Sequence, residues 1–142
     1  MPVTFGPSKS HPSYNTFLAQ NTPLGDPVFG GYLICKSGGG IAWIVAPLST
    51  EVIRTWYCRD NAVTTAQANA ACGDWFVPTI DKLQDPGYCC KTYWDSSPSA
   101  EYWSSTQRDS TTAWTVFFDS GITGGNSKTG ERPARAFRCV TY

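Results

Sequence analysis

The chain has 142 residues, 41% of them hydrophobic and 15% charged, and its 11 basic and 11 acidic side chains give a formal net charge of zero. A chain of this length fits one domain, which buries roughly 68% of the surface of the unfolded chain. Zero net charge excludes the overall positive field that holds nucleic acid. No run of 18 apolar residues is present, so we also expect no insertion into a membrane.

Residues 1–29 differ in composition from residues 30–142. Five of the ten prolines fall in this first stretch, among Ser, Thr, Asn and Gly and without a helical or strand period, which predicts an extended arm. Such an arm cannot offset the entropy lost on ordering through its own contacts. We therefore expect it to dock on its own domain or, preferably, on a neighbouring subunit. The apolar residues available for docking are Phe5, Tyr14, Phe17 and Leu18.

The rest of the chain combines short strand patterns with two short helices. Thr64 and Gln67 have the spacing of a helix start, and Thr79 caps a second helix that Pro86-Gly87 ends. The expected strands are residues 28–35, 41–46, 102–105, 113–118 and 134–141, with a long turn over 121–130. This pattern predicts an α+β fold of small twisted antiparallel sheets with long loops.

Aromatic residues dominate the predicted core. Six Trp, seven Tyr and seven Phe, against a single Met, supply rigid side chains of large area. Trp103 and Trp114 alternate with polar neighbours on the apolar side of their strands. We interpret both as core residues in preference to platforms for sugar rings.

Six cysteines are present, namely Cys35, Cys58, Cys72, Cys89, Cys90 and Cys139. No Cys-x-x-Cys pair occurs and there is a single histidine, so we expect no zinc site. Disulfides are the favoured interpretation, and the sequence alone does not choose among the pairings. Adjacent Cys89 and Cys90 point in different directions and need separate partners, for which Cys35 and Cys58 are candidates. The alternative is that some of the six are buried free thiols.

Five strings occur in an order that spans most of the chain. They are Gly40–Pro47 after Gly30-Gly31, Trp75–Thr79, Tyr102–Ser105, Ala113–Val116 and Arg138–Val140. Together they resemble the C-type-lectin-like domain of the Legionella collagen-like adhesin C-terminal family. The resemblance implies a disulfide-stapled C-type-lectin-like fold, which begins with a hairpin and closes with the Arg-Cys-Val strand, and a role in binding. It also implies that Cys72 pairs with Cys139.

Two polar stretches between strands are candidates for ligand binding. Residues 106–112 and 124–128 combine amide, guanidinium and hydroxyl groups with backbone freedom, which suits recognition of sugar hydroxyls or of a protein surface. The alternative is that these loops only connect strands. The candidate ligand-binding residues are Gln107, Arg108, Asp109, Thr111, Asn126 and Lys128.

Basic side chains gather near the C-terminus. Residues 120–142 carry Lys128, Arg132, Arg135 and Arg138 against Glu131 alone. This strip has the charge to hold sulfated or phosphorylated glycans. We favour the other interpretation, in which these side chains pair with acids of the same chain.

The sequence offers little for metal or catalytic chemistry. The triplets Glu-Pro-Asn, Gln-Pro-Asp and Trp-Asn-Asp, which hold calcium in sugar-binding lectins of this fold, are absent. A Ser/His or Cys/His pair would need His11, which lies in the arm beside Pro12. We therefore predict no metal, no cofactor and no enzymatic activity.

The start of the chain bears on location. Residues 1–9 lack the basic start and apolar stretch of a signal peptide. The chain is then either a mature form that begins at an added Met or a protein that leaves its cell without the secretion machinery, as a virus particle released by lysis does.

We accordingly favour a structural protein on the surface of a phage virion, either a small decoration subunit or one associated with a tail fibre. Its arm is expected to contact other virion proteins, and its domain a glycan or protein of the host surface, as a single copy or as a homo-oligomer. The alternatives are an extracellular or bacterial cell-surface adhesin and, less favoured, an enzyme of lectin-like fold with a reactive thiol.

Overall fold

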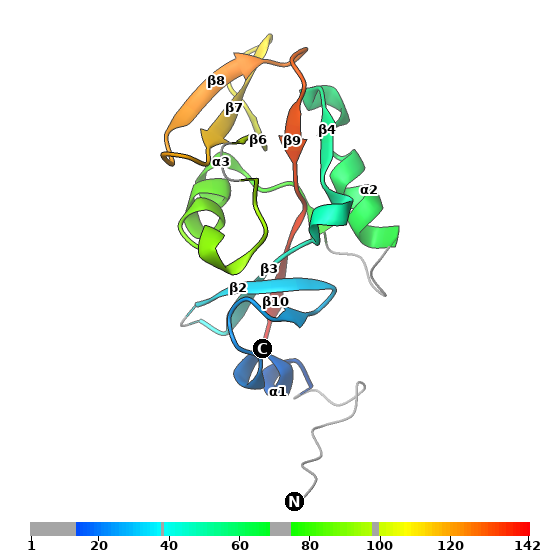
Figure 1. The fold of residues 1–142 in the computed structure, drawn as a ribbon, viewed down its shortest axis with the longest axis vertical. Coiled ribbons are helices and arrows are strands. Elements are labelled where there is room, and N and C mark those ends of the chain that lie inside the picture. The colour runs from blue at the N-terminus through cyan, green and yellow to red at the C-terminus, as the bar shows by residue number, and fades with distance from the viewer. Residues whose placement is uncertain (1–13, 38, 69–74, 98–99) are drawn as a thin grey trace, which may run out of the picture.

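The computed structural model describes residues 14–37, 39–68, 75–97 and 100–142. The predicted α+β class is confirmed: small antiparallel sheets are joined by a few short helices (Figure 1). The strands are β1 (Pro27–Val28), β2 (Gly31–Ser37), β3 (Ile41–Val45), β4 (Val52–Arg54), β5 (Trp75–Phe76), β6 (Glu101–Gln107), β7 (Thr112–Phe117), β8 (Thr123–Ser127), β9 (Arg132–Ala134) and β10 (Phe137–Thr141). The helical segments are α1 (Tyr14–Asn21), η1 (Leu48–Thr50), η2 (Trp56–Cys58), α2 (Asn61–Ala68), α3 (Ile80–Lys82), η3 (Leu83–Tyr88) and η4 (Lys91–Tyr93).

The largest sheet brings the two ends of the domain together. Its strand order is β1-β2-β3-β10-β5, so the last strand pairs with the opening hairpin, Phe137 opposite Val45 and Thr141 opposite Ile41. The predicted strand over 134–141 is in fact two strands, because the chain leaves the β4–β9 ribbon at Ala134 and enters the large sheet at Phe137. Arg135 therefore lies in the connection between the β4–β9 ribbon and the large sheet.

The β2–β3–β10 part of this sheet has a hydrophobic cluster on each face. One cluster contains Leu33 and Ile44, and the other contains Ile34, Val45 and Phe137. Alternating side chains explain this division, since successive residues of a strand point to opposite faces. Within the second cluster the Trp94 ring meets that of Phe137 edge to face, with centroids 5.7 Å apart. The predicted aromatic core is present in this form.

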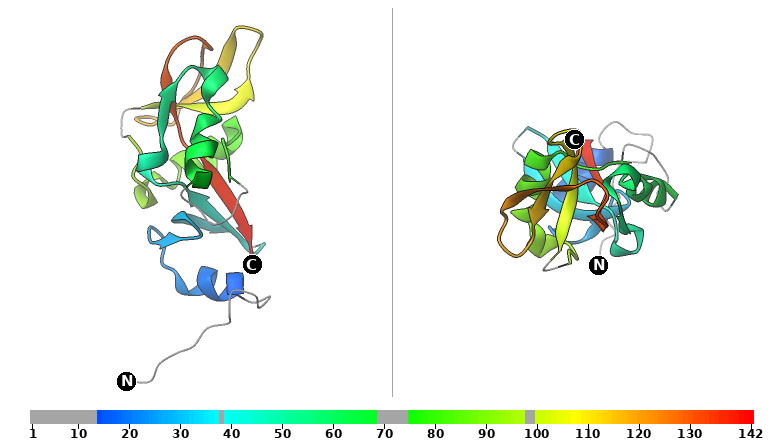
Figure 2. Two further views of the ribbon diagram at one scale, coloured as in Figure 1. Left: turned by 90° about the vertical axis from the view of Figure 1, so that its right-hand side faces the viewer. Right: turned by 90° about the horizontal axis from the view of Figure 1, so that it is seen from above.

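The third sheet, β6-β7-β8, lies at the end of the molecule opposite α1 (Figures 1 and 2). Strand β8 falls within the stretch predicted as a long turn. Its sequence Thr-Gly-Gly-Asn-Ser has no apolar period, and pairing with β7 along its whole length makes it a strand. The turn before it needs Gly121, whose φ of 77° is in the region that side chains disfavour.

Helix α1 contradicts part of the predicted arm. Residues 14–21 are helical instead of extended, and the helix packs on its own domain beside the C-terminus (Figures 1 and 2). Ala19 is fully buried, Lys36 Nζ donates to the carbonyl of Ala19 at 3.0 Å, and Asn15 Nδ2 donates to Thr141 O at 3.5 Å. The docking residues Tyr14, Phe17 and Leu18 are accordingly half-buried in their own chain. Phe5 lies outside the described residues.

The two helices predicted for the middle of the chain are present with different bounds. Helix α2 begins at Asn61, three residues before the predicted Thr64, because the carbonyl of Asp60 already accepts hydrogen bonds from the amides of Val63 and Thr64. The predicted stop, Gly73, lies outside the described residues. The second helix begins after Thr79 as expected. It kinks at Asp85, which precedes Pro86 and is extended.

The predicted disulfide staple is not supported. All five described cysteines, Cys35, Cys58, Cys89, Cys90 and Cys139, are free thiols; Cys72, and with it the Cys72–Cys139 pair, lies outside the described residues. Strand geometry shows why Cys35 cannot reach Cys139. Each lies opposite Trp43 on the intervening strand β3, and two strand spacings of about 4.8 Å exceed the roughly 7 Å that a disulfide spans between Cα atoms.

Candidate binding site

The tip of the β6–β7 hairpin is closed by the side chain of Asp109. One of its carboxylate oxygens accepts hydrogen bonds from the amides of Thr111 at 2.9 Å and Thr112 at 2.7 Å. The amides of Arg108 and Asp109 both donate to the carbonyl of Thr112. These contacts lower the pKa of Asp109 to about 2, and the hydrogen bond from the Thr111 amide is the largest cause. The carboxylate thus stays ionised, and the turn closed, at any pH near neutrality.

Arg108 lies across the side of the sheet next to this turn. Its guanidinium carbon is 5.3 Å from the centre of the Trp114 ring, within the range of a cation–π contact. Gly125 makes this position possible, because a Cβ there would lie 2.4 Å from Cδ of Arg108. A guanidinium nitrogen also comes within 3.6 Å of Asp109, and each of the two side chains remains about half exposed, at 47% and 50%.

Lys128 supports the tip from inside the molecule. It is only 3% exposed, and its Nζ donates to Gln107 Oε1 at 2.9 Å and to the carbonyl of Ser110 at 3.1 Å. The same ammonium lies 4.8 Å from the centre of the Trp56 ring. The Lys128 ammonium therefore holds the tip, so its part in a site is to position other groups. Gln107 accepts one of these hydrogen bonds through Oε1 and is itself exposed.

Asn126 belongs to the opposite face of the sheet from Arg108. It pairs with Ala113, whereas Gly125 pairs with Trp114, and neighbouring residues of a strand point to opposite faces. Its amide donates to Glu101 at 2.7 Å and accepts from Arg132 Nη2 at 3.0 Å. Arg132 also forms an ion pair with Glu101. Asn126 is therefore tied to an internal cluster and does not reach the tip.

The predicted site residues thus separate into three groups. The tip surface, a name kept here for Arg108, Asp109 and Thr111, is exposed to solvent. Lys128 lies beneath it, Gln107 is exposed beside it, and Asn126 lies on the other face. Trp114 joins the site unexpectedly: it is half-buried instead of fully in the core, whereas the prediction for Trp103 is confirmed at 1% exposure. The pattern of alternation was the same for both, and each ring has a guanidinium carbon 5.3 Å from its centre, so the degree of burial is what separates them.

Two of the basic residues near the C-terminus, Arg132 and Arg135, pair with acids of the same chain, as the favoured interpretation predicted. Lys128 and Arg138 donate hydrogen bonds to neutral oxygens. Arg132 pairs with Glu101, and Arg138 donates to the carbonyl of Phe29 at 2.7 Å. Arg135 is fully buried and forms ion pairs with Glu51 at 3.1 Å and Asp95 at 2.9 Å. These contacts leave little of the strip for sulfated or phosphorylated glycans.

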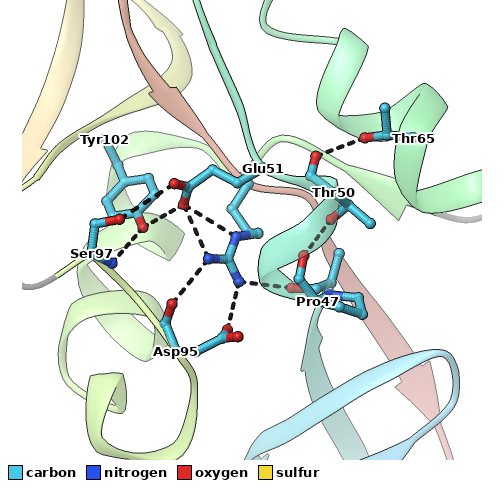
Figure 3. A network of polar contacts seen from close by, with 9 residues as sticks. Pro47, Thr50, Glu51, Thr65, Asp95, Ser97 and Tyr102 are labelled. Atoms are coloured by element: carbon cyan, nitrogen blue, oxygen red, sulfur yellow. Dashed lines mark hydrogen bonds and ion pairs between the residues drawn. The ribbon is translucent and has the colours of Figure 1, made fainter.

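The network around Arg135 joins three parts of the chain (Figure 3). Besides its two acids, Arg135 donates to the carbonyls of Ala46 and Asp95. The Tyr102 hydroxyl donates to Glu51 at 2.5 Å and accepts from the Ser97 amide at 2.8 Å. Burial, followed by the hydrogen bond to Glu51, raises the pKa of Tyr102 to about 12. All the strong donors and acceptors of this network have partners, which indicates a structural role.

Two open depressions lie away from the tip surface and meet at Tyr32. One, of about 430 Å³, is lined by Pro27, Val28, Gly30, Gly31, Tyr32 and Pro47. The other, of about 360 Å³, is lined by Gly25, Tyr32, Thr92, Tyr93, Trp94 and Asp95. Within the described part of the chain, no three His, Cys, Asp or Glu side chains are arranged to hold a metal ion. No helix among the described residues is long and apolar enough to cross a membrane.

No model of a protein family matches this chain, and no curated protein is significantly similar to it in sequence.

Proposed function

We propose that this protein is a non-catalytic binding protein that contacts a host-surface glycan or protein through the tip surface. The observation that carries the proposal is the way the tip is held. Asp109 closes the turn, and Lys128 donates hydrogen bonds to Gln107 and Ser110 from beneath the tip. The side chains of Arg108 and Asp109 stay half exposed. A polar group that is fixed before binding loses little entropy when a ligand arrives, so affinity is gained without further ordering.

The chemistry of the tip surface suits a neutral polar ligand. Arg108 and Asp109 carry opposite charges 3.6 Å apart, so their fields largely cancel at a distance. At close range they offer several N–H donors and a carboxylate acceptor beside the partly exposed ring of Trp114. Adjacent hydroxyl groups of a sugar, with the apolar face of its ring, match this combination of groups.

Two wider elements of the proposal concern fold and location. A C-type-lectin-like fold is supported by the pairing of the closing strand β10 with the opening hairpin β2–β3 and by the small separate sheets. Location on a phage virion is supported by the sequence resemblance and by the proline-rich start of the chain. With Tyr14, Phe17 and Leu18 in a helix on their own domain, docking on other virion proteins is assigned to residues 1–13, including Phe5.

The binding role is tested with a panel of immobilised bacterial surface polysaccharides and with whole bacterial cells. We expect the protein to bind at least one of these, and Arg108→Gln to weaken that binding by tenfold or more. Lys36→Gln is the matched control, since it removes the same charge from β2, a strand that lies towards the α1 end of the molecule and away from the β6-β7-β8 sheet (Figure 1), and it should bind as the wild type does. Equal binding by Arg108→Gln and wild type would place the ligand elsewhere.

The location is tested by mass spectrometry of purified phage particles. Peptides of this protein should be present at a fixed ratio to those of the major capsid protein. Recovery from bacterial surface fractions alone would favour the adhesin, the alternative already raised by the sequence.

A further inference from the structure

A β-bulge in β2 turns Cys35 toward the second hydrophobic cluster. The register between β2 and β3 shifts between Leu33 and Cys35, so Leu33 lies opposite Ile44 and Cys35 lies opposite Trp43. Without the shift, Cys35 would share a face with Leu33. With it, Ile34 and Cys35 both contact the cluster on the other face. Bulges commonly redirect a side chain in this way.

Cys90 reaches the same place from the other side of that cluster. It precedes η4 and is held there by a hydrogen bond from its amide to the carbonyl of Pro86 at 2.9 Å. Like Cys35, it is half-buried against the cluster. The Cys35 thiol lies near enough to raise the pKa of the Cys90 thiol. Two cysteines that lie 55 positions apart in the chain therefore pack against one cluster as neighbours.

Of the described cysteines, only Cys35 and Cys90 pack against the second hydrophobic cluster. Cys139 is separated from Cys35 by the whole width of β3. Cys89 is exposed, whereas its neighbour Cys90 faces inward, as expected for adjacent residues that point in different directions. The pair of Cys35 and Cys90 is thus the one that local geometry selects.

Burial makes Cys90 a weak nucleophile in its thiol form. It raises the pKa of Cys90 to about 11, and the adjoining Cys35 thiol adds to the effect. Since the thiolate is the nucleophile, Cys90 is a poor target for alkylating reagents at neutral pH. The Cys35 thiol is its neighbour, however, so a bond between the two sulfur atoms forms within one molecule and needs no collision between two molecules.

We propose that Cys35 and Cys90 are a site of oxidative modification, at which a low-molecular-weight disulfide converts the two thiols into a crosslink between β2 and the segment before η4. One S–S bond forms between the two cysteines and the S–S bond of the oxidant breaks. The oxidant takes up the two electrons and two protons and leaves as two thiols. The crosslink would restrain the unfolded chain and so stabilise the fold, which suits a protein that works outside a reducing cell.

The test uses the full chain, incubated with glutathione disulfide or with dithiothreitol, then alkylated and digested with trypsin. The expected product of oxidation links residues 10–36 to residues 83–91, and fragmentation of this pair of peptides should place the bond on Cys90. The melting temperature should rise on the order of 5–10 °C relative to the reduced protein. Linkage of residues 10–36 to the peptides of Cys58, Cys72 or Cys139 would overturn the proposal.

Two variants separate the adjacent cysteines. Cys89→Ser should keep both the crosslink and the rise in melting temperature, and Cys90→Ser should lose both. A crosslink that survives in Cys90→Ser, or one that needs Cys89, would contradict the assignment. If Cys90→Ser does not fold, fragmentation of the wild-type product still decides between the two positions. Recovery of Cys35 and Cys90 as free, alkylated residues after oxidation would also overturn the proposal.

Discussion

At the scale of single residues, the buried charge of Arg135 depends on its partners. Arg135 is fully buried, and its guanidinium is satisfied by Glu51, by the Asp95 carboxylate and by the carbonyls of Ala46 and Asp95. Removing one member of such a group leaves an uncompensated charge in a poorly solvated place, which costs far more than the loss of a surface pair. Arg108 lies on the surface, where its ion pair with Asp109 is half exposed and its loss costs little.

We predict that Arg135→Leu lowers the free energy of unfolding by about 3–5 kcal/mol, because Glu51 remains buried without its partner. Arg108→Leu should lower it by less than about 1 kcal/mol, since its ion pair is half exposed. Urea unfolding followed by tryptophan fluorescence measures both. Similar losses in the two variants would show that the Arg135 network does not carry this stability.

Tyr102 makes stability depend on alkaline pH. Its pKa is raised in the folded protein from about 10 to about 12, so the folded state keeps a proton that the unfolded state loses between these values. The resulting stability is complete below pH 10 and is lost as the pH rises from 10 towards 12. Between pH 9 and 11 the wild type should lose about 1.3 kcal/mol more than Tyr102→Phe. Parallel curves for the two proteins in denaturant titrations would contradict this.

At the scale of elements, a turn requires glycine where the side chain of another residue would not fit. The turn between β7 and β8 closes with Gly121, whose amide donates to the carbonyl of Phe117 at 2.7 Å. A Cβ on Gly121 would lie 2.4 Å from the ring of Tyr88. The positive φ and the close ring act together, so glycine is required here on two grounds.

Gly121→Ala is therefore expected to lower the free energy of unfolding by about 1–3 kcal/mol. Gly39→Ala is a control in another hairpin turn, because no atom lies within 4 Å of the position that its Cβ would take. It should change stability by less than about 0.5 kcal/mol. Thermal unfolding of the two variants, measured in parallel, distinguishes a steric requirement from a general preference for glycine in turns.

Several elements were predictable because their signals are local. The hairpin of β2 and β3 follows from two apolar runs around a glycine turn. The helix after Thr79 begins where a residue type that favours the N-cap position predicts it, although the Thr79 hydroxyl bonds to Asp81 and makes no capping hydrogen bond. The exposed tip between β6 and β7 was predictable from its polar residues. Strand β8 was not, because its Thr-Gly-Gly-Asn-Ser sequence has no apolar period and its pairing with β7 makes it a strand. The division between β9 and β10 was not either, since it depends on β4 and β3, which are distant in the sequence. Helix α1 was missed for a similar reason, as its support comes from β10.

At the scale of the whole molecule, one sheet connects two cores. Leu33 and Ile34 are consecutive residues of β2, yet they are buried in different clusters. Because the strand is shared, loss of packing on one face should disturb the other. The protein is therefore expected to unfold as one unit.

We predict that Leu33→Ala and Ile34→Ala each lower the free energy of unfolding by about 2–5 kcal/mol. Both should unfold in a single transition with the wild-type dependence on denaturant. Circular dichroism and tryptophan fluorescence, followed in the same urea titration, should give coincident curves. Two separated transitions in either variant would mean that the clusters are independent.

The sequence by itself determined the opening hairpin and the polar hairpin tip, because each depends on residues that are close in the chain, and it determined the fold class and the aromatic core through composition and the order of short patterns. Only the tertiary structure decided which candidate residues share a surface. In it, Lys128 lies beneath the tip and Asn126 on the far face. Arg135 pairs with Glu51 and Asp95, and Cys35 and Cys90 pack against the same cluster. Strand pairing, a bulge and burial produce these arrangements, and they act between residues whose separation no local pattern records.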